Sequence, residues 1–254
     1  MTTVVVTMAG GGTRFRDAGY ALPKYEIAAH GHSLFWWSLN SLRHFIESSG
    51  RVIFVCLAEN ESVPFVRQQC TELGVERYRT IELDKISAGQ ASSAYLSQTE
   101  WLADQPLVIF NIDTMVDPVW LQPESIPAGS DGWIPCCRAS GDHWSFVRTD
   151  ENACWAVEVA EKRRISHHAS IGFYWFSRPE LFIDAYHLAL SDSASSPLRE
   201  RYVAPLYQTM IEAGRRISIL EIPTQAVNVL GTPAELATFI NRPMPLIQSG
   251  KPNT

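Results

Sequence analysis

The chain has 254 residues, of which 46% are hydrophobic and 19% charged, and its formal net charge is −6 at pH 7. This length accommodates one large α/β domain or two small ones, and the composition is that of a globular protein with a buried core. The acidic balance argues against a nucleic-acid-binding surface, and no apolar stretch approaches the roughly 20 residues that a membrane span requires.

The first half of the chain alternates strand-like and helix-like segments. Apolar β-branched runs predict strands, and apolar residues at helical spacing predict helices. The predicted elements, in chain order, are a strand at Thr3–Met8, a helix at Ser33–Ile46 with a serine N-cap, a strand at Arg51–Leu57, a helix at Glu61–Leu73, a strand at Arg79–Leu83, a helix at Ala88–Leu102 and a strand at Pro106–Ile112. This alternation predicts a mostly parallel sheet that is covered on both faces.

From about Trp133 the pattern changes to closely spaced strands with polar turns between them. We expect them to form an antiparallel extension that builds one wall of a cleft. The predicted elements are strands at Trp133–Cys137, Ser145–Thr149, Ala153–Val159 and Ser170–Phe176, helices at Arg178–Leu190 and Arg199–Ala213, a late strand pair at Arg216–Ile222 and Ala226–Val229 that returns toward the main sheet, and a short helix at Pro233–Ile240.

The cysteines and the first residues indicate the compartment. Five cysteines form no Cys-x-x-Cys pair and leave one unpaired in any set of disulfides, so a reduced cytoplasm is the simplest interpretation. The start of the chain lacks a basic segment, a long apolar run and a small-residue cleavage site, which favours a first strand over a signal peptide. We therefore expect a cytoplasmic protein.

A glycine-rich loop follows the first strand directly, with the sequence Met8-Ala9-Gly10-Gly11-Gly12-Thr13-Arg14-Phe15. Glycines let backbone N–H groups approach an anion closely, and the guanidinium of Arg14 adds donors for phosphate oxygens. Ten residues later, Pro23 would stiffen a turn that aims Lys24 into the same cleft. The loop is neither a Walker A sequence nor Gly-x-Gly-x-x-Gly, and taken alone it is equally compatible with a plain tight turn.

The combination of Ala-Gly-Gly-Gly-Thr-Arg-Phe with the downstream Pro-Lys resembles the signature of the nucleotidyltransferases that make nucleoside-diphosphate sugars. The resemblance extends from Thr3 to about Leu236. It implies a Rossmann-like three-layer α/β/α fold with a mostly parallel mixed sheet. It further implies one domain at 1–242, with a nucleotide-binding half at 1–130 and an acceptor-binding half at 131–242, before a loosely ordered tail at 243–254.

In this family the glycine loop wraps the triphosphate, and the arginine and lysine bind phosphates in the transition state. The resemblance therefore assigns nucleotide binding to the loop and catalysis to the two cations. The residues are Ala9, Gly10, Gly11, Gly12 and Thr13 for the loop, and Arg14 and Lys24 for catalysis.

Two further segments extend the nucleotide site. Gly89-Gln90 opens a helix, and the resemblance implies that the glycine backbone and the Gln90 side chain contact the base, although Gly89 could merely permit a turn. Asn111-Ile112-Asp113 closes a strong strand, where α/β sheets bind ligands. The resemblance places Asn111 beside the nucleotide and makes Asp113 the catalytic carboxylate that holds Mg²⁺, a cation that prefers such oxygens. Alternatively, Asp113 could be an N-capping residue at the start of a loop.

The acceptor site is implied by Glu161-Lys162 and by Gly172. In the family the Glu-Lys pair meets the sugar phosphate, so Glu161 would accept hydroxyl hydrogen bonds and Lys162 would hold the phosphate. Gly172 would let the backbone approach the acceptor. The alternative for the pair is a solvated charged turn beside two arginines.

One departure from the family pattern concerns the metal. The family often closes its site with Asp-x-Gly-Thr-Pro, whose Asp is a second metal ligand, but the Asp position here is Val229. Asn228, one residue earlier, is the remaining candidate metal ligand, although it would face the other way if the segment is a strand.

The resemblance predicts a magnesium-dependent enzyme that joins an NTP to a phosphorylated small molecule, such as a sugar 1-phosphate, and releases pyrophosphate. Related enzymes of surface-polysaccharide precursor synthesis include cytidylyltransferases, so pyrimidine nucleotides are favoured. The alternatives are a GT-A-type glycosyltransferase, which usually carries Asp-x-Asp where this chain has Asn111-Ile112-Asp113, and a non-catalytic nucleotide-sugar-binding protein. No nucleic-acid or membrane partner is expected, and a homo-oligomer is left open.

Overall fold

The computed structural model describes residues 1–151, 154–191 and 200–245. From residue 246 on, the predicted tail lies outside the described residues. Within the described ranges, no helix combines the length and the apolarity that crossing a bilayer requires.

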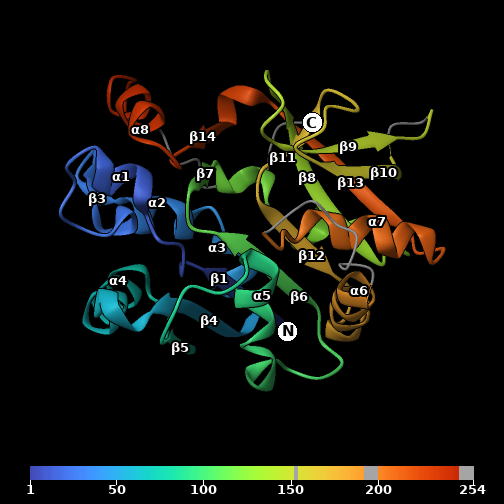
Figure 1. The fold of residues 1–254 in the computed structure, drawn as a ribbon, viewed down its shortest axis with the longest axis horizontal. Coiled ribbons are helices and arrows are strands. Elements are labelled where there is room, and N and C mark those ends of the chain that lie inside the picture. The colour runs from blue at the N-terminus through green and yellow to red at the C-terminus, as the bar shows by residue number, and fades with distance from the viewer. Residues whose placement is uncertain (152–153, 192–199, 246–254) are drawn as a thin grey trace.

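A ten-stranded mixed sheet crosses the molecule, with the order β10-β9-β11-β8-β12-β6-β1-β4-β5 and with β13 paired to β8 beside this path (Figure 1). Four strands form a parallel core, as predicted: β1 (Thr2–Thr7), β4 (Ser49–Leu57), β5 (Tyr78–Leu83) and β6 (Leu107–Asn111). The extension consists of β8 (Gly132–Arg138), β9 (Ser145–Thr149), β10 (Ala156–Glu161), β11 (His168–Ser170), β12 (Phe173–Phe176) and β13 (Ile217–Ile222).

Helices cover both faces of the sheet because apolar side chains of the strands alternate between them. In β1, Val5 packs in a cluster with α5 (Gln90–Tyr95), α6 (Pro179–Ser191) and α7 (Ala204–Glu212). Val4 and Val6 pack in a second cluster, whose helices are α2 (Leu34–Asn40), α3 (Arg43–Glu47) and α4 (Val63–Leu73). The predicted three-layer α/β/α fold is therefore confirmed.

A smaller layer lies at the carboxyl ends of the core strands. It comprises α1 (Thr13–Asp17), α8 (Pro233–Ile240) and two short two-stranded sheets, formed by β2 (Ala28–Ala29) with β3 (His32–Ser33) and by β7 (Thr114–Val116) with β14 (Val227–Val229). Of the late strand pair, β13 joins the main sheet as predicted. The other strand, β14, pairs with β7 instead.

Three predicted elements are shorter or divided. Ser33 caps α2 by accepting a hydrogen bond from the Trp36 amide, as predicted, but the helix ends before Ser41, whose hydroxyl donates to the Trp37 carbonyl and accepts from the Val116 amide. Such side-chain bonds compete with helix continuation. The helix predicted at 88–102 reduces to α5 and a 3₁₀ turn at Gln98–Glu100. The strand predicted at 170–176 divides into β11 and β12.

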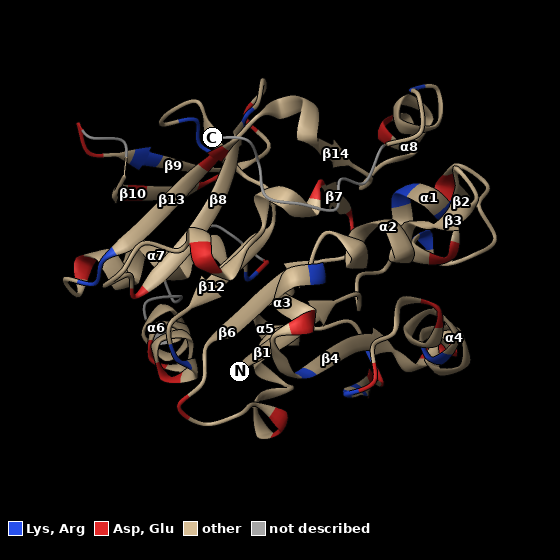
Figure 2. Cartoon of the chain, turned by 180° about the vertical axis from the view of Figure 1, so that it is seen from behind, with Lys and Arg blue, Asp and Glu red and all other residues tan. Residues whose placement is uncertain are grey.

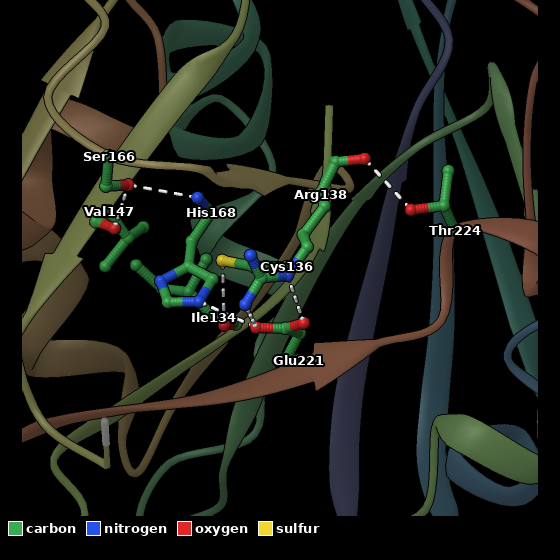
Figure 3. A network of polar contacts seen from close by, with 8 residues as sticks. All are labelled: Ile134, Cys136, Arg138, Val147, Ser166, His168, Glu221 and Thr224. Atoms are coloured by element: carbon green, nitrogen blue, oxygen red, sulfur yellow. Dashed lines mark hydrogen bonds and ion pairs between the residues drawn. The ribbon is translucent and has the colours of Figure 1, made fainter. Parts of the chain in front are cut away.

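The extension is tied together by a polar network on β8, β11 and β13 (Figure 3). The Glu221 carboxylate accepts hydrogen bonds from Arg138 Nε at 2.7 Å and Nη2 at 3.3 Å, and it lies 2.8 Å from His168 Nε2. Hydrogen bonding to Arg138 lowers the pKa of Glu221. The Thr224 hydroxyl donates to the Arg138 carbonyl, so the segment after β13 is fastened to β8 as well.

Acidic and basic residues are interspersed along the elements of both halves (Figure 2). The electrostatic character of a binding site in this molecule is therefore set by a few side chains that meet locally.

Candidate active site

A cleft of about 670 Å³ opens at the carboxyl ends of β1 and β6. The carboxyl ends of the strands are the usual place for ligands in α/β sheets. The cleft is lined by segments from both halves of the chain. Most of the residues predicted from the sequence line it: Ala9, Gly10, Gly11, Gly12, Arg14, Lys24, Gly89, Gln90, Asn111, Asp113, Glu161 and Gly172. Thr13, Lys162 and Asn228 are not among the lining residues.

The glycine loop runs from the end of β1 into the first turn of α1. Gly12 has a φ of +61°, which glycine adopts without strain, and it stands at the N-cap of α1. The following helix is anchored by Phe15, which is 2% exposed and packs edge-on against Tyr20. A Cβ on Gly10 or Gly12 would meet nothing within 4 Å, so the loop presents open backbone to the cleft. These features suit close approach of an anion.

Lys24 and Asp113 meet across the cleft. The Lys24 ammonium donates to Asp113 Oδ2 at 2.8 Å, and the two side chains are 21% and 29% exposed. Pro23 precedes the short 3₁₀ turn at Lys24–Glu26 and orients the lysine, and β6 delivers the aspartate from 89 residues further along the chain. The Leu230 amide also donates to the backbone carbonyl of Asp113 at 2.7 Å, so the segment after β14 is fixed to the backbone of Asp113.

Gly89 is required by both conformation and space. Its φ is +134°, and a Cβ there would lie 2.5 Å from the Arg201 nitrogen and 2.6 Å from the Arg201 oxygen. The Arg201 amide donates to the Ala88 carbonyl at 2.7 Å, and the Ala91 amide donates to the Arg201 carbonyl at 2.9 Å. The Gln90 side chain enters the cleft and donates to Thr7 Oγ1 at 3.2 Å. The turn at Gly89 therefore clamps the predicted base-contacting loop to residues 200–202.

Glu161, predicted to bind the acceptor, lies at the end of β10. Burial raises the pKa of its carboxyl group, and a hydrogen bond from the Ser145 hydroxyl partly opposes that effect. Lys162 has a φ of +51°, and its ammonium donates to the Tyr202 hydroxyl and lies 4.4 Å from the centre of that ring. Tyr202 in turn donates to Glu200, and burial together with this bond raises the pKa of the phenol. Lys162 itself does not line the cleft, but it is bonded to Tyr202, which does.

Asn111 and Gly172 are in direct contact. Gly172 has a φ of +80° at the break between β11 and β12, and a Cβ there would overlap the Asn111 carboxamide. The Asn111 amide nitrogen of the backbone donates to the Gly172 carbonyl at 3.2 Å. The side-chain Oδ1 is buried and has no hydrogen-bond partner among the described residues.

Asn228 points away from the cleft. In β14 it pairs with Met115, its Nδ2 lies 3.3 Å from Met115 Sδ, and its Oδ1 accepts from Arg242 at 3.3 Å. Val229, its neighbour in the strand, lines the cleft instead, as side-chain alternation requires. The structure therefore does not bring Asn228 to Asp113.

No protein-family model and no curated protein matches this chain. Among solved structures, the nucleoside-diphosphate-sugar pyrophosphorylase from Vibrio cholerae RC9 matches with 31% identity and a TM-score of 0.85, over 94% of this chain and 100% of that one. The chain belongs to the nucleoside-diphosphate-sugar pyrophosphorylase family. Two more distant structures share its fold.

The first of these is the inositol-1-phosphate CTP transferase from T. maritima, with 17% identity, a TM-score of 0.73 and coverage of 92% of this chain and 91% of that one. The second is a protein assigned as a glucose-1-phosphate thymidylyltransferase from Bacillus anthracis, in complex with a sucrose. It has 12% identity, a TM-score of 0.74 and coverage of 97% and 98%. The match to the Vibrio cholerae protein confirms the predicted family and enzyme class, a nucleotidyltransferase.

Several lining residues of this nucleotidyltransferase were not predicted from the sequence. Ser145 and Tyr174 border Glu161, Glu200 and Tyr202 border Lys162, and Glu235 borders Asp113. Glu200 and Tyr202 stand in no recognisable motif, whereas Ser145 and Tyr174 lie in segments similar to the family that did not single them out. Glu235 follows Thr232 by three residues, which is a helix-capping pattern, so a structural role conceals its position in the cleft.

Proposed function

We propose that this protein transfers a nucleotidyl group from an NTP to a sugar phosphate or a similar phosphorylated metabolite, with release of pyrophosphate. The observation that carries the proposal is the Lys24–Asp113 pair, which lies in the same cleft as the glycine loop and Arg14. Membership of the pyrophosphorylase family supports the same reaction.

The donor set at Asp113 fits a divalent cation. The Asp113 carboxylate is a hard-oxygen ligand at the edge of the cleft, and Gly231 leaves the space beside it free of a side chain. The described residues contain no group of three or more His, Cys, Asp or Glu side chains that could hold a metal by themselves. This suits Mg²⁺, which takes one or two carboxylates and completes its shell with phosphates and water. When bound, Mg²⁺ would neutralise charge on the phosphate oxygens.

The reaction forms one P–O bond and breaks another. An acceptor phosphate oxygen attacks the α-phosphorus of the NTP, and the bond from that phosphorus to the bridging oxygen breaks in line, so that its electrons leave with pyrophosphate. The nucleophile is already anionic, so positioning and charge neutralisation matter more than a general base. In this proposal Lys24 exchanges Asp113 for a phosphate oxygen, and Arg14 neutralises further charge on the transferred and leaving groups.

The opposite wall would hold the acceptor. Glu161 is available to accept hydrogen bonds from acceptor hydroxyls, and Gly172 lies in the lining of the same cleft. Lys162 adds positive charge at the edge of the cleft, and the neutral phenol of Tyr202 holds its ammonium in place. Gln90 lies where it could read the edge of a nucleotide base. We further propose a pyrimidine nucleotide and a role in polysaccharide precursor synthesis in the cytoplasm, following the pattern of the related cytidylyltransferases.

The test is pyrophosphate release, with Mg²⁺, from each common NTP against a panel of sugar 1-phosphates and other phosphorylated metabolites. With the active pair, Lys24→Ala and Asp113→Ala should each lower kcat/KM by a factor on the order of 10² or more. Circular dichroism would show that both variants remain folded. Asp184→Ala removes an exposed carboxylate on α6, outside the cleft lining, and should leave kcat/KM unchanged.

Near-wild-type turnover in either cleft variant would contradict the proposed roles. Nucleotide binding without any pyrophosphate release across the panel would favour a non-catalytic binding protein. The absence of nucleotide binding would refute the interpretation of the glycine loop.

A further inference from the structure

A carboxylate from α8 borders the same part of the cleft as Asp113. We propose that Glu235 is a ligand for the divalent cation beside Asp113, in place of the aspartate that this chain lacks at Val229. The inference rests on the proposed function, because it concerns the cation that would accompany the NTP.

Glu235 and Asp113 face the same small space. A Cβ built on Gly231 would lie 3.4 Å from Asp113 Oδ2 and 3.6 Å from Glu235 Oε2, so both oxygens border the volume that the absent side chain would fill. All three residues line the cleft. Two carboxylates that border one space repel each other unless a cation lies between or beside them. Lys24 supplies one positive charge, at Asp113 Oδ2.

The backbone holds Glu235 in this position. Thr232 is the N-cap of α8 and accepts from the Glu235 amide at 3.2 Å, while its hydroxyl donates to Glu235 Oε2 at 2.9 Å. The Thr232 hydroxyl therefore bonds both the backbone and the side chain of Glu235, which fixes the glutamate against the first turn of α8. The bond from the Leu230 amide to the Asp113 carbonyl anchors the preceding residues. One short segment thus fixes the second carboxylate relative to the first.

Val229 stands where the family pattern has an aspartate. It lines the cleft with an apolar side chain, and Asn228 is turned toward Met115 and Arg242. Neither can offer a carboxylate to a cation near Asp113. Glu235 is longer than an aspartate, so a glutamate on the following helix reaches the region that an aspartate on the strand would otherwise serve.

A purely structural capping role is the alternative, and a conservative substitution separates the two. Glu235→Gln keeps the backbone amide and the side-chain oxygen that bond the Thr232 hydroxyl, but it removes the negative charge that a hard cation requires. The probe is Mn²⁺, which suits the same oxygen ligands as Mg²⁺ and whose free concentration is measured by electron paramagnetic resonance. Titrations use the full chain, first with Mn²⁺ alone and then with Mn²⁺ and CTP or UTP.

We expect Glu235→Gln and Asp113→Asn each to weaken Mn²⁺ binding by about tenfold or more, since altering even the groups that support a ligand has effects of this size. The melting temperature of Glu235→Gln should stay at the wild-type value, and Asp184→Asn should bind Mn²⁺ as the wild type does. Wild-type Mn²⁺ affinity in Glu235→Gln, or no Mn²⁺ binding by the wild type, would overturn the inference.

The same proteins distinguish this inference from the proposed function. Pyrophosphate release by the wild type, together with undiminished Mn²⁺ affinity in Glu235→Gln, refutes the ligand role and leaves the reaction intact. Loss of Mn²⁺ affinity in Glu235→Gln without pyrophosphate release from any NTP supports the cation site and contradicts the reaction.

Discussion

The contact between Gly172 and Asn111 can be tested by adding a single methyl group. Gly172→Ala places a Cβ where the Asn111 carboxamide lies, at a φ of +80°. The positive φ costs about 1–2 kcal/mol for a residue other than glycine. Displacing the carboxamide adds about 1–3 kcal/mol, the usual cost of overpacking a well-filled site.

A matched control isolates the two contributions. Gly214 has a φ of +75°, and a Cβ there would meet nothing within 4 Å, so Gly214→Ala should show the backbone cost alone. We therefore expect Gly172→Ala to lower the free energy of unfolding by about 1–3 kcal/mol more than Gly214→Ala does. At roughly 2–4 °C per kcal/mol for a chain of this size, the difference should also appear in the melting temperature.

Urea denaturation measures these free energies, and an unchanged m value shows that only stability has changed. Combining Gly172→Ala with Asn111→Ala completes a double-mutant cycle, in which removal of the carboxamide should restore the part of the loss that is due to overlap. Equal losses in Gly172→Ala and Gly214→Ala, or no coupling in the cycle, would refute the account of this contact. Gly172→Ala should also lower kcat/KM, because Asn111 lines the cleft next to Asp113.

Two further predictions follow from buried ionisable groups. Because burial raises the pKa of Glu161, the native state binds its proton more tightly than the unfolded chain. This contribution to stability is present in acid and is lost as pH rises through the native pKa. Glu161→Gln should therefore gain stability relative to the wild type between acid and neutral pH while losing activity, and a difference in unfolding free energy that does not change with pH would count against this. Four of the five cysteines are buried, and burial raises the pKa of Cys70 to about 12 and of Cys56 to about 11. A thiol reagent at neutral pH should label only Cys154 in the native protein and all five cysteines after unfolding; rapid labelling of a second native thiol would contradict the described burial.

The parallel core could be predicted because its signals are local. The strand at Leu107–Asn111 opens with the uninterrupted apolar run Leu107–Phe110. The helix at Pro233–Ile240 has the predicted bounds, and a threonine cap and a first-turn proline mark its start. The cleft side chains that belong to motifs, such as Arg14 and Lys24, were likewise found from the sequence and meet in one cavity.

The helix and strand breaks and the cleft residues that could not be predicted depend on contacts with residues far away in the chain. The break after α2 involves a bond between Ser41 and Val116, and the break between β11 and β12 accommodates Asn111, so neither leaves a periodic signal in its own segment. Tyr202 enters the cleft only because Arg201 pairs with the backbone around Gly89. The spacing of residues along the sequence does not indicate these long-range contacts.

The spread of the cleft along the chain has a consequence for its synthesis. The residues that line the cleft extend from Thr7 to Glu235, so more than two hundred peptide bonds are formed between the synthesis of the first and that of the last. A ribosome completes the glycine loop early, yet Asp113 and Glu235 meet only after α8 has emerged. Nascent chains that stop short of α8 contain the glycine loop without an assembled cleft, so the capacity for turnover should arise in one late step instead of growing with chain length.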